Sequence, residues 1–190
     1  MTLPGLVAAT HRRHYAVELD GGETLACVLK GRTTTLACGD RVAVERAQQG
    51  GVIVDVAPRR SLLYRSDAFR EKLIAANVTQ VVGVVAPDVP VDEHLLNRWI
   101  VAAETQACRF VLAVNKADLP DAGPFAGRFA AYARLGYAVV PVSARHDVSP
   151  LLPWMWSPAR AAPPPQRRAS AGRPPSCPPR ARFPVIAARW

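Results

Sequence analysis

The sequence predicts an OB-like β barrel, followed by a partial parallel α/β sheet and a disordered Pro/Arg-rich tail. Three observations support this fold class. Short alternating apolar runs separated by turn residues extend to about position 66, apolar strands alternate with helical patterns to about 154, and the composition then changes abruptly. The 190 residues are 49% hydrophobic and 21% charged, which suits one ordinary domain or two small ones.

Residues 1–66 carry the pattern of the barrel. Asp20-Gly21-Gly22 and Gln49-Gly50-Gly51 are hairpin signals, and the runs between the turns are rich in Val, Thr and Tyr. About five short antiparallel strands are expected, and they would form a closed or partly closed barrel. An OB-type barrel is the preferred interpretation, with another small barrel as the alternative.

Residues 67–154 predict the first half of a parallel α/β domain. After a connecting stretch over 67–76, continuous apolar runs indicate strands that are buried on both faces. Helical spacing after Asp92, a candidate N-cap, indicates a helix between the first two strands. The expected elements are strand 78–86, helix 92–106, strand 109–114, helix 124–135 closed by Gly136, and strand 137–143. Ligands of such sheets bind at the carboxyl ends of the strands.

Residues 155–190 are expected to be disordered. The last forty residues contain ten of the eighteen prolines and seven arginines, but no Asp, Glu or Lys. Such a segment cannot bury enough apolar surface to offset its ordering entropy. Because +7 of the formal net charge of +9 lies there, the overall basicity says little about what the rest of the chain binds.

The composition also bears on the cellular compartment. No apolar run approaches the length needed to span a bilayer, and no secretory leader is evident, so no membrane association is expected. The four cysteines show no C-x-x-C pair, which favours reduced thiols in a cytoplasmic protein. No metal site is predicted.

The stretch VLAVNKADLP, residues 111–120, ends a predicted strand with Asn-Lys-x-Asp. A carboxylate at Asp118 can accept both the ring N–H and the amino group of guanine, a donor pair that adenine lacks. Asn115 would brace the loop, and the stem of Lys116 would cover the ring. After the next predicted strand comes Val-Ser-Ala, in which the backbone N–H of Ala144, following Ser143, could donate to guanine O6. A chance N-K-x-D in an unrelated α/β protein is the competing interpretation.

The chain resembles the ribosome-small-subunit-dependent GTPase A (RsgA, or YjeQ) family. The matching stretches include CGDRVAVE, GVIVDVAPRRSLLYRS, AANVTQVVGVVA, LLNRWIVAAE, VNKADLP and VPVSARHDVSPL, and together they cover positions 5 to about 154. The resemblance implies an OB barrel followed by a circularly permuted GTPase domain, whose base-reading motifs precede its phosphate loop. It also implies binding of GTP or GDP with magnesium, GTP hydrolysis coupled to maturation of the small ribosomal subunit, and binding to that subunit and its rRNA.

The sequence departs from this family after about residue 154. The family pattern continues with G-x-x-x-x-G-K-[ST], D-x-x-G and a zinc-binding Cys/His cluster, none of which occurs in these 190 residues. A frameshift near codon 155 is one hypothesis, and sequencing the coding DNA downstream of that codon tests it. Without a phosphate loop, the chain is expected to lack catalytic residues and not to hydrolyse GTP.

Basic residues of the barrel suggest a second function. They could follow RNA phosphates, as OB barrels do, although solvated strand edges are a simpler explanation of the same pattern. The chain would then be a noncatalytic rRNA- or ribosome-binding module. A monomer is expected in either case. The candidate RNA-binding residues are Lys30, Arg32, Arg41, Arg59 and Arg60.

Overall fold

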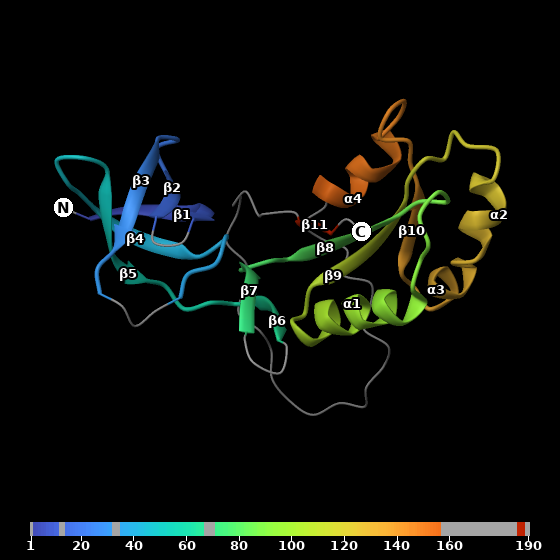
Figure 1. The fold of residues 1–190 in the computed structure, drawn as a ribbon, viewed down its shortest axis with the longest axis horizontal. Coiled ribbons are helices and arrows are strands. Elements are labelled where there is room, and N and C mark those ends of the chain that lie inside the picture. The colour runs from blue at the N-terminus through green and yellow to red at the C-terminus, as the bar shows by residue number, and fades with distance from the viewer. Residues whose placement is uncertain (1, 12–13, 32–34, 67–70, 157–185, 189–190) are drawn as a thin grey trace. The chain divides into compact units, whose positions relative to one another are not determined.

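The computed structural model describes residues 2–11, 14–31, 35–66, 71–156 and 186–188. The chain divides into two compact units, Met1–Thr79 and Gln80–Trp190, and each contains one part of the predicted architecture (Figure 1). The sequence-based boundaries after residues 66 and 154 stay a prediction. None of the helices in the described ranges is long and apolar enough to cross a membrane.

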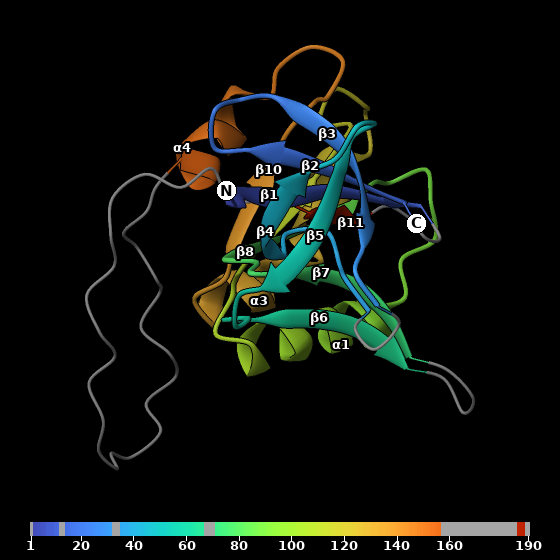
Figure 2. The ribbon, with the colours of Figure 1, turned by 90° about the vertical axis from the view of Figure 1, so that its left-hand side faces the viewer.

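The first unit contains a closed five-stranded barrel with the strand order β1-β2-β3-β5-β4. Strands β3 and β5 pair in parallel, and the other neighbours pair antiparallel, including β1 with β4, which closes the barrel. Figure 2 shows β5 between β3 and β4. The OB-like barrel predicted from the sequence is thereby confirmed. The strands are β1 (Thr2–His11), β2 (His14–Leu19), β3 (Thr24–Leu29), β4 (Arg41–Arg46) and β5 (Gly51–Val56).

Alternating side chains of these strands fill the barrel. Val7, Val17, Val44 and Ile53 come from four different strands, and each is at most 1% exposed. Burying each of these side chains contributes roughly 1.5–3 kcal/mol to folding. Buried residues alternate with more exposed ones along these strands, as the period-two orientation of strand side chains requires.

A two-stranded antiparallel sheet follows the barrel, formed by β6 (Leu62–Ser66) and β7 (Glu71–Ala76). The sequence pattern predicts only a connection over 67–76, so β7 is a correction to that expectation. Backbone hydrogen bonds fix the end of β7, because the Ala76 N–H donates to the Cys38 carbonyl at 2.8 Å. The sequence did not reveal β7 because its side chains do not alternate between buried and exposed positions, although its partner β6 is the preceding strand.

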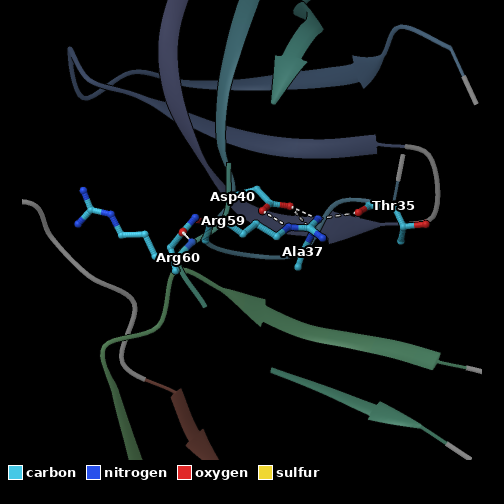
Figure 3. Close-up of polar contacts among 7 residues, drawn as sticks. Thr35, Ala37, Asp40, Arg59 and Arg60 are labelled. Carbon is cyan, nitrogen blue, oxygen red and sulfur yellow. Dashed lines mark hydrogen bonds and ion pairs between the residues drawn. The ribbon is translucent and has the colours of Figure 1, made fainter. Parts of the chain in front are cut away.

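A fully buried carboxylate, Asp40, joins the loop before β4 to the segment after β5 (Figure 3). It accepts hydrogen bonds from Arg59 Nε and Nη2, both at 2.7 Å, and from the Ala37 N–H at 2.8 Å. Arg59 also donates to the Thr35 carbonyl at 2.8 Å, and its hydrogen bond to Asp40 raises the pKa of the guanidinium. Buried charges persist when they are paired and hydrogen-bonded, so this cluster holds the chain where it leaves the barrel.

The second unit is built on a parallel sheet of order β10-β9-β8-β11. Strands β8 (Gln80–Val85) and β9 (Arg109–Val114) are almost wholly buried, as their continuous apolar sequences predict. Strand β10 (Ala138–Pro141) pairs with β9 and is shorter than the predicted 137–143. The partial parallel sheet expected from the sequence is confirmed.

Helices cover both faces of this sheet. Helix α1 (Glu93–Thr105) packs through Leu96, Ile100 and Ala103, and Asp92 caps its first turn by accepting a hydrogen bond from the His94 N–H at 2.9 Å. Figure 1 shows α1 and α4 (Leu152–Trp156) on opposite faces. Helix α4 follows a 3₁₀ turn, η1 (Ser149–Leu151), and Leu151 and Trp154 pack on the core beneath it.

The segment between β9 and β10 differs from the single helix predicted over 124–135. It forms two short helices, α2 (Ala122–Gly127) and α3 (Ala130–Arg134). Gly127 weakens the helix where the two meet, and Phe129, which is 0% exposed, is the N-cap of α3. Burying this ring therefore favours two short helices over the single helix that the sequence pattern predicts. The predicted end at Gly136 holds, because this residue adopts a φ of 95°.

The predicted disordered tail lies outside the described residues over 157–185 and 189–190. Within it, Ile186–Ala188 forms strand β11, which pairs in parallel with Val81, Val82 and Gly83 of β8. Met155 and Trp156, which end α4, also differ from the expectation of disorder over 155–190. For Ile186–Ala188 the structure differs from it as well. The reason is the edge of β8, whose backbone donors and acceptors need partners.

We expect Arg59→Met to destabilise the first unit by about 2–4 kcal/mol, because it leaves the buried Asp40 carboxylate without its counter-charge. Chemical denaturation of the purified chain measures this effect. Arg60→Met is the matched control, because Arg60 is exposed and its side chain points away from the cluster in Figure 3. Equal stabilities of the two variants would contradict the structural role assigned to Arg59.

We also expect Gly50→Ala to destabilise the barrel more than Gly22→Ala. Both glycines have a positive φ, 83° and 87°, so both substitutions carry similar backbone strain. Only at Gly50 would the new Cβ meet a backbone atom, the Ala26 carbonyl oxygen, at 2.1 Å. Thermal unfolding should show that Gly50→Ala lowers the free energy of unfolding by about 1–3 kcal/mol more than Gly22→Ala. A difference near zero would contradict the close approach of Gly50 to the Ala26 carbonyl.

Candidate functional site

The carboxyl ends of β8, β9 and β10 are joined by backbone hydrogen bonds. The Asn115 N–H donates to the Val85 carbonyl at 2.8 Å, which links β9 to β8. On the other side, the Val142 N–H donates to the Val114 carbonyl at 2.9 Å, and the Ala117 N–H donates to the Val142 carbonyl at 3.0 Å. The loops that follow the three strands therefore start from one rigid edge.

The Asn-Lys-x-Asp stretch turns sharply at that edge. Lys116 has a φ of 61°, in the left-handed region that non-glycine residues adopt uncommonly. The Leu119 N–H donates to the Lys116 carbonyl at 3.1 Å and closes the turn. The turn reverses the chain directly after β9 and brings Asp118 towards the loop that follows β10.

Two side-chain contacts connect this turn to the loop after β10. Ser143 Oγ donates to Asp118 Oδ1 at 2.6 Å, and the Ala144 N–H donates to Asn115 Oδ1 at 2.9 Å. Four of the five residues predicted to bind guanine are thereby brought together. Ser143 is itself held in a small closed loop, because its N–H and carbonyl exchange hydrogen bonds with Asp147 at 2.9 and 2.8 Å.

Asp118 remains accessible at the centre of this cluster, with 37% of its side chain exposed. The hydrogen bond from Ser143 is the main cause that holds the pKa of Asp118 below its ordinary value of 3.8. His146 and Arg145 contribute in the same direction, and His146 Nε2 lies 3.8 Å from Asp118 Oδ2. The group is therefore an ionised acceptor at neutral pH, and it loses its charge only as the pH falls through this lowered pKa. A carboxylate has about four lone-pair sites, so acceptor capacity remains beside the Ser143 bond.

Two features of the cluster differ in detail from the sequence-based expectation. The Ala144 N–H, assigned there to a guanine O6, donates to Asn115 in the structure, so a ligand oxygen would have to share this donor. Lys116 extends to the other side and forms an ion pair with Asp88 in the loop after β8. Asp88 is not among the site residues predicted from the sequence. The only sequence signal for Asp88 is its position after a predicted strand, which it shares with Asn115.

The candidate RNA-binding residues do not share one environment. Arg41 donates to Asp20 at 2.9 Å, and Arg59 is engaged with Asp40 as described above. Lys30 and Arg60 are exposed. Arg32 lies outside the described residues. Two of the five cations therefore have intramolecular partners in the barrel unit.

The described residues do not supply the donor set of a metal centre. No group of three or more His, Cys, Asp and Glu side chains that could hold an ion occurs in the described ranges. This absence concerns closed sites of the zinc type, because magnesium that accompanies a nucleotide is held mainly by phosphate oxygens and water.

The protein-family model of the RsgA GTPase matches residues 56–157, which include the whole cluster and more than half of the chain. The protein named small ribosomal subunit biogenesis GTPase RsgA of Nitrosospira multiformis is 46% identical over 155 residues, which are 80% of this chain and 50% of that one. The chain thus spans about half the length of the curated relatives it matches.

Two solved structures are similar in fold. The crystal structure of YjeQ from Thermotoga maritima superposes with a TM-score of 0.60 at 28% sequence identity, over 76% of this chain and 53% of that one. YloQ, described as a circularly permuted GTPase, superposes with a TM-score of 0.57 at 20% identity, over the same shares, and supports the fold alone. The order of the elements, the extent of the family match and the identity to the curated relative lead to one conclusion: the chain belongs to the RsgA GTPase family.

Proposed function

We propose that the cluster formed by Asn115, Lys116, Asp118, Ser143 and Ala144 is the base-reading part of a guanine-nucleotide site. The hydrogen bond between Ser143 and Asp118 is the observation that carries this proposal. It orients the carboxylate and helps to keep it ionised, so that its free lone pairs can accept the N1–H and the 2-amino group of guanine together. Adenine has no donor pair of this geometry.

Rigidity of the surrounding backbone supports the same function. Selective recognition requires acceptors that do not move when the ligand binds. Asn115 is fixed through its N–H to β8 and through its side chain to the loop after β10. In this arrangement Asn115 acts as a brace, and Asp118 makes the discriminating contact.

The biological setting that we propose is biogenesis of the small ribosomal subunit. The relatives that match this chain carry that function in their names, and the chain belongs to their family. Small-subunit rRNA is then the expected macromolecular partner. A noncatalytic RNA-binding module has less support, because Arg41 and Arg59 are engaged within the barrel unit.

We further propose that the 190-residue chain does not hydrolyse GTP by itself. Phosphoryl transfer depends on groups that position and neutralise the γ-phosphate, namely a phosphate loop, magnesium and the residues that hold it. The 190 residues contain no G-x-x-x-x-G-K-[ST] sequence. Contacts to the base alone would leave most of a nucleotide's charge without partners.

Asp118→Asn should reverse the base preference of the chain. An Asn amide donates where the carboxylate accepts, so it suits the 2-carbonyl of xanthine and not the 2-amino group of guanine. We expect guanine nucleotide affinity to fall by roughly 10- to 100-fold relative to xanthine nucleotide, the loss of one charge-assisted hydrogen-bond pair. NMR titration with GDP and xanthosine diphosphate measures both affinities. Asp121→Asn, an exposed change three residues later, is the control, and an unchanged preference in Asp118→Asn would contradict base reading.

The purified chain should release phosphate from GTP with magnesium only at the uncatalysed rate. It should bind GTP and GDP with an affinity weaker than micromolar, because the phosphate contacts are missing. A phosphate-release assay and calorimetry test the two statements, with the full-length Nitrosospira multiformis relative as the positive control. Micromolar binding by the 190-residue chain would show that other residues hold the phosphates.

A further inference from the structure

An ion pair connects the candidate base site to the neighbouring strand end. Lys116 Nζ contacts Asp88 Oδ2, and the two side chains are 44% and 43% exposed. Asp88 lies in the loop between β8 and α1, whereas Lys116 lies in the turn after β9. Contact with Lys116 is also the main cause that lowers the pKa of Asp88.

The strand order determines on which side of β9 this ion pair lies. Because β9 lies between β10 and β8, Asp118 bonds towards the β10 side and Lys116 extends towards the β8 side. The side chain of Lys116 therefore extends along the edge of the sheet, from the turn that also carries Asp118 to the loop after β8. Its four methylene groups offer an apolar strip of the kind against which a planar base can pack.

The backbone of Lys116 fixes where this apolar strip begins. The position of the strip therefore depends on what holds the ammonium end of the side chain. With a φ of 61°, the residue holds an uncommon conformation that sets where the side chain begins. The remaining freedom is that of a long side chain, whose rotamer entropy is among the largest of any residue. A carboxylate that captures the ammonium group removes much of this freedom before a ligand arrives, and preorganisation of that kind raises affinity.

We propose that Asp88 is a positioning residue of the base site, which holds the stem of Lys116 extended as the surface on which guanine packs. This inference rests on the proposed function of the site. It assigns Asp88 no contact with the nucleotide, because a carboxylate near phosphate groups would repel them. The loop after β8 thereby becomes part of the site, whose other residues all follow β9 or β10.

A double-mutant cycle on the 190-residue chain tests the inference, with NMR titration of guanosine 5′-monophosphate as the readout and adenosine 5′-monophosphate as the comparison ligand. The variants are Asp88→Asn, Lys116→Met and both together. Lys116→Met retains an apolar stem and removes the ammonium group. We expect Asp88→Asn to weaken binding of the guanine nucleotide by about two- to fivefold, the range of a half-exposed ion pair. In the Lys116→Met background, the same change should have no effect.

Two further measurements separate positioning from general structural damage. Asp88→Glu should recover at least half of the lost affinity, since it restores the charge. In the chain without nucleotide, Asp88→Asn should increase the mobility of the Lys116 side-chain methylenes, whereas Asp121→Asn should leave it unchanged. Unfolding curves that coincide for all variants exclude a loss of fold as the cause.

The possible outcomes distinguish this inference from the function on which it rests. If the unmodified chain does not prefer the guanine over the adenine nucleotide, both the proposed function and the role of Asp88 are wrong. If it does prefer guanine and Asp88→Asn has no effect, only the role of Asp88 is wrong. A loss that persists in the Lys116→Met background also overturns the inference, because Asp88 would then contact the ligand directly.

Discussion

The parallel pairing of β9 with both β8 and β10 is the constraint on which the second unit depends. Five of the six residues of β9 are buried, and its neighbours fix its register on both sides. Because parallel strands end at the same edge, this pairing brings three loops together. The backbone bonds of Asn115 and Val142 extend the pairing past the strand ends. The candidate site is therefore positioned by buried apolar strands, although its own side chains are mostly polar and only Ser143 among them is buried.

Within that site, the same few contacts serve stability and recognition. The hydrogen bond between Ser143 and Asp118 joins two loops, and it also lowers the pKa of the carboxyl group. The Asn115 side chain uses its oxygen to hold the Ala144 backbone. Such sharing explains why base recognition needs two loops that lie far apart in the chain. Hydrolysis of a nucleotide would require further groups, placed around its phosphates.

The barrel unit shows how charge count can mislead about function. Its sequence offers several cations that could contact RNA phosphates, but Arg59 neutralises the buried Asp40, and Arg41 pairs with Asp20. A buried carboxylate without a counter-charge would be costly, so Arg59 is tied to the fold. Exposed cations such as Lys30 and Arg60 are not required to neutralise this carboxylate. A residue's chemical type thus indicates what it could bind, and its neighbours decide whether it is available.

The sequence by itself determined the elements whose signals are local. These are the alternating barrel strands, the buried runs of β8 and β9, the Asp92 cap of α1, and the place of the base-reading motifs after strands. The tertiary structure alone decided the β6–β7 sheet, the division of the predicted second helix, and the partners of Lys116 and the Ala144 N–H. The partners of Lys116 and the Ala144 N–H are distant in the chain, whereas the β6–β7 hairpin and the divided helix lack a clear periodic pattern. Periodicity and capping describe a residue's immediate neighbours, whereas such pairings arise only when the whole sheet or barrel has assembled.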